Sequence, residues 1–380
     1  MLQPLKDMTH LGKVNCELKV NCESEVVILD GSMGNYIRSS DIPQDEGSLF
    51  TKIWSAAALV LPEYHETIIK AHMEYIKCGS EIISTNSYAI QPNYYQKAFG
   101  CHKYEDLMLS HAKLAAQLAD TARSRSHSND KVRIFGALGP ICESHHPGKF
   151  EKYVTENGSN FCVNTYENIA LSLLEGGVDG FLVETMNCWK ETYLALEGVK
   201  NAMQNNRERG NNMPIIVSLQ GSLRNDALQP SPLELGPVYV RNFLKYFDEN
   251  PSLNIVAFGL NCADAEDILS SFQSIFGTKI YLDDTKKGPC YEYLAEAFKL
   301  RNIKVVAYPN LNDASQLHRE GYDVSKGKFV KQRKDMVDDD HKGFSNLMET
   351  LVKSFDVSYV GGCCGCSPNG IKKLSEKFRL

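Results

Sequence analysis

The feature that most constrains the fold of this chain is a repeated pairing of a short apolar run with an amphipathic helix. Each run ends in a polar or glycine-containing tip, and the helix follows. Nearly continuous apolar strands that alternate with helices are typical of a parallel sheet covered on both faces. Eight such units favour an α/β fold of the (β/α)8 TIM-type barrel class. A doubly wound open sheet is the alternative, but no Gly-x-Gly-x-x-Gly follows the first run. The runs span residues 26–29, 81–86, 132–138, 180–183, 214–219, 255–260, 303–307 and 357–360.

Two regions at the edges of this repeat suggest the domain organisation. Residues 1–24 show no clear period and are interpreted as an N-terminal extension, so residues 25–380 form one barrel domain. Residues 277–302 hold an extra apolar run and an extra helix, which predicts an insertion before strand seven. The run at 280–282 can also be read as a strand in its own right. Residues 321–341 are expected to form a mobile segment.

Composition and charge exclude several classes of function. A hydrophobic content of 43% suffices for a large core, and no apolar run has the length of a membrane helix, so we expect no membrane association. The net charge of -6, without a basic stripe, gives no support for nucleic-acid binding. Twelve cysteines occur without a signal-peptide pattern, which predicts a cytoplasmic location where thiols stay free for metal binding or catalysis.

Polar residues and cysteines collect where the predicted strands end. Asp30, the segment 86–88, Glu184, Cys262 and the pair at 363–364 each follow an apolar run directly. In a (β/α)8 barrel, the carboxyl ends of all eight strands meet at one rim, and functional groups lie there. We therefore expect these residues to form one site.

The Gly-Gly-Cys-Cys-Gly run at 361–365 predicts a metal site. Adjacent cysteines rarely form a disulfide with each other, but both can bind one metal ion if the backbone bends, as the glycines allow. A zinc site needs at least one more ligand, and Cys262 is the best candidate. With Cys363 and Cys364 it would leave the fourth position open, as in catalytic zinc sites. Any single cysteine can instead be a small buried hydrophobe, and we expect Cys188 and Cys366 not to be ligands.

The expected chemistry follows from this ligand set. Three thiolates make zinc electron-rich, so a thiol substrate in the fourth position would stay deprotonated yet nucleophilic, which suits alkyl transfer better than hydrolysis. Asp30 and Glu184 can hold a substrate ammonium, although each can also be an ordinary hydrogen-bonded carboxylate. Trp54 and Tyr88 can face a cationic donor, although core packing is the alternative for both.

These motifs together resemble the zinc-dependent homocysteine S-methyltransferase family, from about residue 26 to the C-terminus. The resemblance implies a (β/α)8 barrel that binds Zn²⁺ through Cys262, Cys363 and Cys364. It also implies homocysteine as the methyl acceptor, with Asp30, Gly31 and Glu184 at its amino-acid end. The motifs are Leu-Asp-Gly-Ser-Met-Gly at 29–34, Ile-Trp-Ser-Ala at 53–56, Ser-Thr-Asn-Ser-Tyr at 84–88, Val-Glu-Thr-Met at 183–186, Gly-Leu-Asn-Cys at 259–262, and Gly-Gly-Cys-Cys-Gly at 361–365 with Pro368.

The methyl donor is suggested by finer features of the same resemblance. Trp54-Ser55-Ala56 and Glu184-Thr185 are similar to the branch that uses S-methylmethionine or S-adenosylmethionine. Betaine users have an aromatic residue where this chain has Thr185, and folate users carry the barrel within a longer chain. The chain departs from the family pattern at residues 141–144 and after residue 310.

We therefore expect transfer of a methyl group from S-methylmethionine, or from S-adenosylmethionine as a second donor, to homocysteine. The expected partners are small-molecule substrates only. Two alternatives remain open: a betaine-dependent homocysteine methyltransferase, and a non-catalytic zinc or thiol-redox binding protein on the same barrel.

Overall fold

A computed structural model describes residues 26–100, 104–127, 131–142, 144, 147–220, 232–276, 280–281, 290–291, 294–312, 332–337 and 340–379. The predicted extension at 1–24 lies outside the described residues, as does most of the segment 321–341. Residues 332–337 of that segment lie against the strand ends, with a bridge between Gln332 and Asn312.

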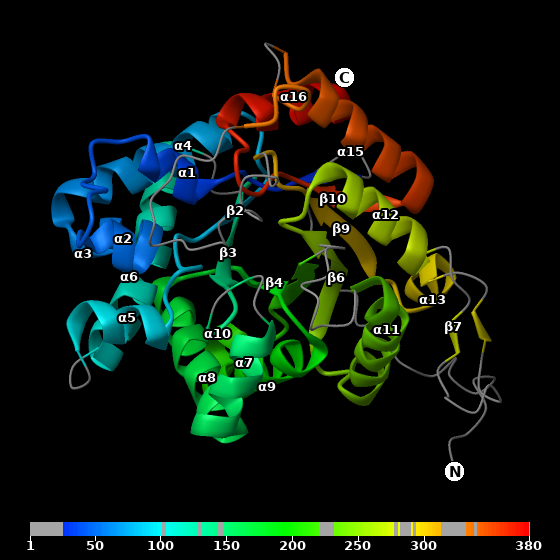
Figure 1. Ribbon diagram of the computed structural model, residues 1–380, viewed down its shortest axis with the longest axis horizontal. Helices are drawn as coiled ribbons and strands as arrows, with labels where there is room; N and C mark the ends of the chain where they lie inside the picture. Colours follow the sequence, from blue (N-terminus) through cyan, green and yellow to red (C-terminus); the bar gives the residue numbers. More distant parts are fainter. Residues whose placement is uncertain are drawn as a thin grey trace.

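Eight parallel strands form a single sheet that curls into a barrel (Figure 1). The order is β1-β10-β9-β6-β5-β4-β3-β2, and a parallel bridge from Leu29 to Ile82 joins the two end strands. All eight apolar runs contribute a strand, which confirms the predicted (β/α)8 barrel. The strands are β1 (Val27–Ile28), β2 (Ile82–Ser84), β3 (Arg133–Leu138), β4 (Gly180–Met186), β5 (Pro214–Gln220), β6 (Asn254–Asn261), β9 (Lys304–Tyr308) and β10 (Val357–Val360).

Helices surround the barrel in the order in which they follow the strands (Figure 1). None of the helices in the described part of the chain combines the length and the apolar character needed to cross a membrane. The helices are α1 (Met33–Arg38), α2 (Leu49–Ile53), α3 (Ala57–Val60), α4 (His65–Lys77), α5 (Pro92–Phe99), α6 (Tyr104–Arg125), α7 (Pro147–Asn157), α8 (Ser159–Gly176), α9 (Trp189–Asn205), α10 (Arg207–Gly210), α11 (Pro232–Glu249), α12 (Ala265–Phe276), α13 (Leu294–Leu300), α15 (Lys342–Phe355) and α16 (Pro368–Arg379), with 3-10 turns at Trp54–Ala56 and Pro62–Tyr64.

The alternation of side chains along each strand produces two separate cores. Residues that point outward pack on the helices: the ring of Phe258 on β6 lies 4.3 Å from the ring of Phe243 on α11. Residues that point inward fill the barrel interior below the rim, as expected for strands buried on both faces. The inward set is Leu29, Ile82, Phe135, Leu182, Ile216, Ala257, Val306, Tyr308 and Tyr359.

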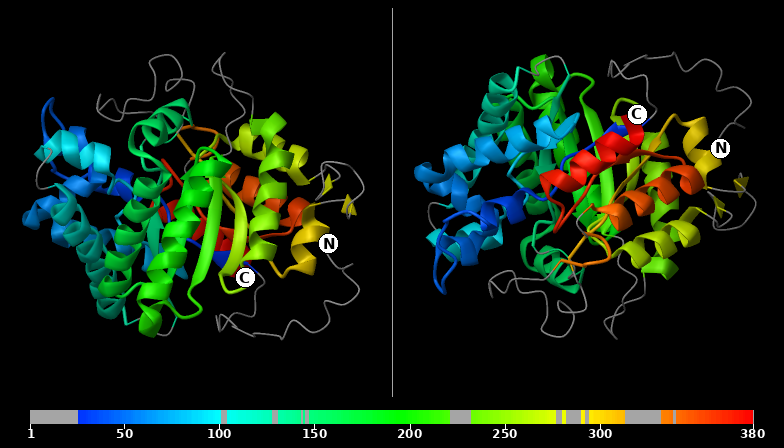
Figure 2. Two further views of the ribbon diagram at one scale, coloured as in Figure 1. Left: turned by 90° about the horizontal axis from the view of Figure 1, so that it is seen from below. Right: turned by 90° about the horizontal axis from the view of Figure 1, so that it is seen from above.

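The predicted insertion before the seventh barrel strand is present as a small hairpin and a helix. Strands β7 (Ile280–Tyr281) and β8 (Cys290–Tyr291) pair antiparallel in a sheet of their own, and α13 follows them. The apolar run at 280–282 therefore does contain strand residues, but they lie at the periphery, outside the barrel (Figure 2).

Candidate metal and substrate site at the barrel rim

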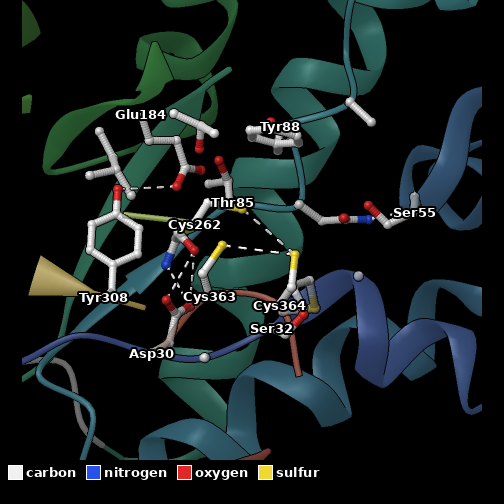
Figure 3. Close-up of a pocket in the computed structure, with 18 of the residues that line it drawn as sticks. Asp30, Ser32, Ser55, Thr85, Tyr88, Glu184, Cys262, Tyr308, Cys363 and Cys364 are labelled. Carbon is white, nitrogen blue, oxygen red and sulfur yellow. Dashed lines mark hydrogen bonds between the residues drawn. The ribbon is translucent and has the colours of Figure 1, made fainter. Parts of the chain in front are cut away.

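A pocket opens at the carboxyl ends of the strands, with a volume of about 1030 Å³ that includes its open mouth. Its wall comes from the tips of β1, β2, β4, β6, β9 and β10, together with α1 and the Trp54–Ala56 turn. All the site residues predicted from the sequence line this one pocket: Asp30, Gly31, Trp54, Tyr88, Glu184, Cys262, Cys363 and Cys364. Figure 3 labels six of them, all except Gly31 and Trp54.

Three cysteine sulfurs meet at one side of the pocket (Figure 3). The Sγ atom of Cys364 lies 3.9 Å from that of Cys262 and 3.9 Å from that of Cys363. All three sulfurs are within 4.8 Å of one another, and none is in a disulfide. A tetrahedral zinc ion with Zn–S bonds of about 2.3 Å requires sulfurs about 3.8 Å apart. Two of the three sulfur spacings match such an ion, and the third is within 4.8 Å.

The loop that carries two of these thiols is fixed by backbone hydrogen bonds to neighbouring strand ends. The N–H of Gly362 donates to the carbonyl of Asp30 at 3.1 Å, and the N–H of Cys363 donates to the carbonyl of Pro309 at 2.8 Å. Gly365 then turns the chain with a φ of +79°, a conformation that favours glycine. The bend that lets adjacent cysteines face one point is therefore built into the backbone.

Cys366 lies behind this loop and does not join the cluster. A Cβ atom on Gly362 would come within 2.2 Å of the Cys366 sulfur, so the glycine makes room for that side chain. The carbonyl of Cys366 accepts hydrogen bonds from the Ser32 N–H and from the Tyr75 hydroxyl, both at 3.0 Å. Cys366 thus ties the loop to the β1 tip and to α4.

The third thiol comes from the end of β6. Cys262 is buried and has a φ of +52°, which is unusual for a residue other than glycine. Its N–H donates to the carbonyl of Tyr308 on the adjacent strand at 3.1 Å. This turn directs the sulfur out of the sheet and toward Cys363 and Cys364.

The chemistry of the cluster calls for a cation. Hydrogen bonds to Cys262 and Cys364, together with burial, raise the pKa of the Cys363 thiol well above its ordinary value. Among the described residues that line the pocket, none is Lys, Arg or His. A bound metal ion is the group that would stabilise three adjacent thiolates here.

Asp30 lies at the tip of β1, and its carboxylate bridges to β2. It accepts a hydrogen bond from the Ser84 N–H at 2.7 Å and from the Ser84 hydroxyl at 3.0 Å. Burial raises the pKa of Asp30 to about 7, although the hydrogen bonds from Ser84 act in the opposite direction. Such a carboxyl group is ready to ionise when a cation arrives.

Glu184 projects into the same pocket from β4 (Figure 3). Burial, and then repulsion from Asp30, raise the pKa of Glu184 to about 8. The hydroxyl of Tyr308 donates to the Glu184 carboxylate at 3.2 Å and lowers that pKa in part. Two buried carboxyl groups that share one cavity form a suitable site for a single ammonium group.

Two aromatic side chains, Trp54 and Tyr88, also line the pocket, and each lies directly over a glycine. A Cβ atom on Gly34 would lie 2.2 Å from the Trp54 indole nitrogen, and one on Gly139 would lie 2.8 Å from the Tyr88 ring. Trp54 has a φ of +50°, which is strained for a bulky residue, and its ring stacks on Phe50 at 6.0 Å. Both rings are therefore held at the pocket and are not merely core filling.

Sequence reasoning missed a buried polar layer at the base of the pocket, which Thr185 and Tyr308 of this layer also line. It consists of Thr185, Ser218, Asn261 and Tyr308, all at least 95% buried and linked by hydrogen bonds. The sequence signal for this layer was a polar residue at an inward-facing position near the carboxyl end of a strand. Cys188, in contrast, precedes α9 outside the pocket, as expected of a residue that is not a ligand.

Fold and pocket together define a (β/α)8-barrel protein with a candidate metal centre of three thiols beside a paired-carboxylate pocket. The chain belongs to the homocysteine S-methyltransferase family, whose characteristic sequence pattern matches residues 27–378. The resemblance inferred from the motifs, and with it the enzyme class, is confirmed.

Individual relatives are distant. The chain is 23% identical over 352 residues to a methionine synthase of Mycobacterium leprae and 22% identical over 350 residues to a methionine synthase of Mycobacterium tuberculosis. Each alignment covers 92% of this chain and 24% of the relative, so the chain spans about a quarter of the length of these curated relatives.

Among solved structures, the chain is similar to the homocysteine methyltransferase MmuM from Escherichia coli. The metallated form of that protein matches with a TM-score of 0.57 and 17% identity, covering 93% of this chain and 97% of the other. Its oxidized form matches with a TM-score of 0.55 and 18% identity over 93% and 97% of the two chains. At this identity the similarity supports the barrel fold.

Proposed function

We propose that this protein transfers a methyl group from a sulfonium donor to the thiol of homocysteine, giving methionine. The observation that carries the proposal is the pocket itself, which places three thiols and two buried carboxyl groups in one cavity. Methyl transfer to homocysteine is supported by the family, and by the methionine synthases that the chain resembles.

Zinc is the proposed cofactor, held by Cys262, Cys363 and Cys364. The support is the sulfur spacing of 3.9 Å for two of the three pairs, together with the family match and the metallated form of MmuM among similar structures. When bound, zinc would supply the Lewis acidity that keeps an acceptor thiol ionised near neutral pH.

The acceptor is proposed to bind with its amino-acid end between Asp30 and Glu184. Their carboxylates would accept hydrogen bonds from its ammonium, and Gly31 would allow close approach because its Cα carries no side chain. A Cβ atom at that position would lie 2.7 Å from the Tyr75 ring, so the packing of this turn on Tyr75 also requires the glycine. This placement directs the acceptor sulfur toward the thiol cluster at the other side of the pocket.

The donor is proposed to be a cation that lies against Trp54 and Tyr88. Aromatic faces attract cations, and the described lining of the pocket offers carboxyl groups but no basic side chain to an anionic donor. S-methylmethionine is the first choice and S-adenosylmethionine the second.

In the reaction, the acceptor sulfur forms a bond to the methyl carbon while the S–CH₃ bond of the sulfonium breaks. The bonding pair leaves on the donor sulfur, which becomes a neutral thioether, and the acceptor thiol proton goes to solvent. Because this leaving group needs no proton, the pocket needs no general acid. The chain contributes binding, orientation and a largely buried setting for the reacting atoms.

A donor screen tests the proposal. Zinc-loaded protein and homocysteine are incubated with S-methylmethionine, S-adenosylmethionine, betaine or methyltetrahydrofolate at equal concentration, and methionine is measured. Faster turnover with either sulfonium supports the proposal. Faster turnover with betaine refutes the donor assignment, and no turnover with any donor favours a zinc or thiol-redox binding protein.

A further inference from the structure

A closed ring of hydrogen bonds lies beneath the pocket and begins and ends at the tip of β4. The Tyr308 hydroxyl reaches the Glu184 carboxylate at 3.2 Å and also contacts the Ser218 hydroxyl. The Ser218 hydroxyl donates to the side-chain oxygen of Asn261 at 3.1 Å. Asn261 in turn accepts from the Thr185 N–H at 3.1 Å and donates to the Thr185 hydroxyl at 2.8 Å. Strands β5, β6 and β9 thereby hold the Glu184-Thr185 dipeptide from below.

The polarity of this ring is set by its donors and acceptors. An ionised carboxylate only accepts, so the Tyr308 proton is directed to Glu184. The Asn261 oxygen has two lone pairs and accepts from both the Thr185 N–H and the Ser218 hydroxyl, while the Ser218 and Tyr308 oxygens lie in hydrogen-bond contact. The Tyr308 proton therefore points to the pocket carboxylate and the Ser218 proton to Asn261, so both hydroxyls are held in one connected network.

The tip of β4 is under strain that the ring offsets. Thr185 has a φ of +58°, and a β-branched residue rarely adopts this left-handed conformation. The Asn261 carboxamide bonds both the N–H and the hydroxyl of that residue, so it fixes the turn in place. Strain retained next to a binding pocket is typical of a functional constraint.

We propose that Tyr308 and Ser218 are positioning residues that orient the Glu184 carboxylate for the acceptor ammonium. The inference rests on the proposed function, in which Glu184 binds the amino-acid end of homocysteine. Neither hydroxyl touches the reacting atoms. Their effect is on the direction of the carboxylate, and so on acceptor affinity.

The barrel interior offers a matched control. Tyr359 on β10 is 5% exposed, as is Tyr308, and both belong to the same inward-facing core. Within the described part of the chain, no hydrogen bond is found for the Tyr359 hydroxyl. Tyr359→Phe therefore removes the same atom from the same core without touching Glu184.

The test compares Tyr308→Phe, Ser218→Ala and Tyr359→Phe with the unmodified protein and with Glu184→Gln. Homocysteine affinity is measured by calorimetry on zinc-loaded protein, and KM and kcat are measured separately. Loss of a hydrogen bond to a charged group predicts an increase of about tenfold in Kd and KM for Tyr308→Phe. Ser218→Ala should give a smaller increase in the same direction, and the double variant should show less than the product of the two effects. In each case kcat stays close to its unmodified value.

The outcomes separate the inference from the proposed function. Weakened binding in Glu184→Gln and Tyr308→Phe, with Tyr359→Phe unchanged, supports both. Weakened binding in Glu184→Gln alone overturns the positioning role and leaves the proposed function intact. Unchanged binding in Glu184→Gln overturns the acceptor site and the inference with it. If Tyr308→Phe does not fold, Ser218→Ala decides the question by the same criteria.

Discussion

Replacing Glu184 by Gln removes the negative charge that this side chain would carry beside a bound ammonium and changes the shape of the side chain little. The carboxamide oxygen can still accept from Tyr308, which donates at 3.2 Å in the present arrangement. The amide nitrogen, however, is a donor and would face the acceptor ammonium in place of a carboxylate oxygen. The substitution therefore tests the ammonium contact and leaves the thiol cluster alone.

The magnitude follows from the type of bond that is lost. A hydrogen bond to a charged group contributes about 1.5–3 kcal/mol, which corresponds to about a ten- to a hundred-fold loss of affinity. The larger end is expected here, because Glu184 is buried and shares its cavity with Asp30. Solvent screens such a contact little.

The assay is calorimetric titration of homocysteine into zinc-loaded protein, with the metal content of each preparation measured beforehand. KM for homocysteine should rise by the same factor as Kd. Glu197→Gln is the matched control: this half-buried glutamate lies on the outer side of α9, where it bonds Lys200 and Tyr246. It loses the same charge at a distance from the pocket and should leave the homocysteine affinity unchanged.

One result refutes the reasoning. If Glu184→Gln retains zinc and binds homocysteine with unchanged affinity, then Glu184 is a structural carboxylate and the ammonium is bound elsewhere. An equal loss in the control would show that overall charge, and not the local contact, governs the affinity.

Three further predictions concern the metal content, the pH dependence of ligand affinity and the Trp54 side of the pocket. Cys363→Ala should lose zinc and activity, whereas Cys366→Ala should keep about one zinc per chain. The zinc content is measured by metal analysis after purification in reductant. Full zinc retention by Cys363→Ala would contradict the ligand assignment. Burial raises the pKa of Asp30 to about 7 and of Glu184 to about 8, so the neutral forms are favoured in the unliganded fold and their contribution to stability is lost as the pH rises through those values. Affinity for methionine, which has the ammonium but no thiol, should therefore increase between pH 6 and 8, by up to about tenfold per pH unit for each carboxyl group that binding ionises, and a flat profile would contradict this. Gly34→Ala should displace the indole that now fills the space of its Cβ, raising KM for the sulfonium and sparing homocysteine affinity; equal effects on both substrates would exclude a donor-specific role.

The position of the site was predictable from the sequence because the barrel topology brings the carboxyl ends of all the strands together. Asp30, Glu184 and Cys262 each follow an apolar run, and a parallel barrel brings the ends of such runs to one rim. The adjacent cysteines at 363–364 indicated the thiol cluster, since neither a disulfide nor core packing explains the pair between glycines. These inferences needed the order of elements and no knowledge of contacts.

The hydrogen-bond ring was not predictable, because it depends on register between strands far apart in the chain. Tyr308 and Glu184 are separated by 124 positions, and the pairing of β4 with β5 shifts register between Val183 and Met186. A shift of one residue would turn Ser218 away from the ring. The run at 280–282 was ambiguous for a related reason: its apolar character predicts a strand but does not specify which sheet the strand joins.

The barrel closes between β1 and β2 through few paired residues, which we call the β1–β2 joint, and local opening of the sheet is expected there. Strands β1 and β2 meet at the single bridge from Leu29 to Ile82, whereas β5 and β6 pair over seven residues. Across the joint, Asp30 accepts the Ser84 N–H, so a side chain that lines the pocket also closes the sheet. Amide hydrogens at this joint should exchange with solvent faster than those of the central strands. A ligand held by Asp30 would slow that exchange, so amide protection at the β1–β2 joint should report occupancy of the pocket directly.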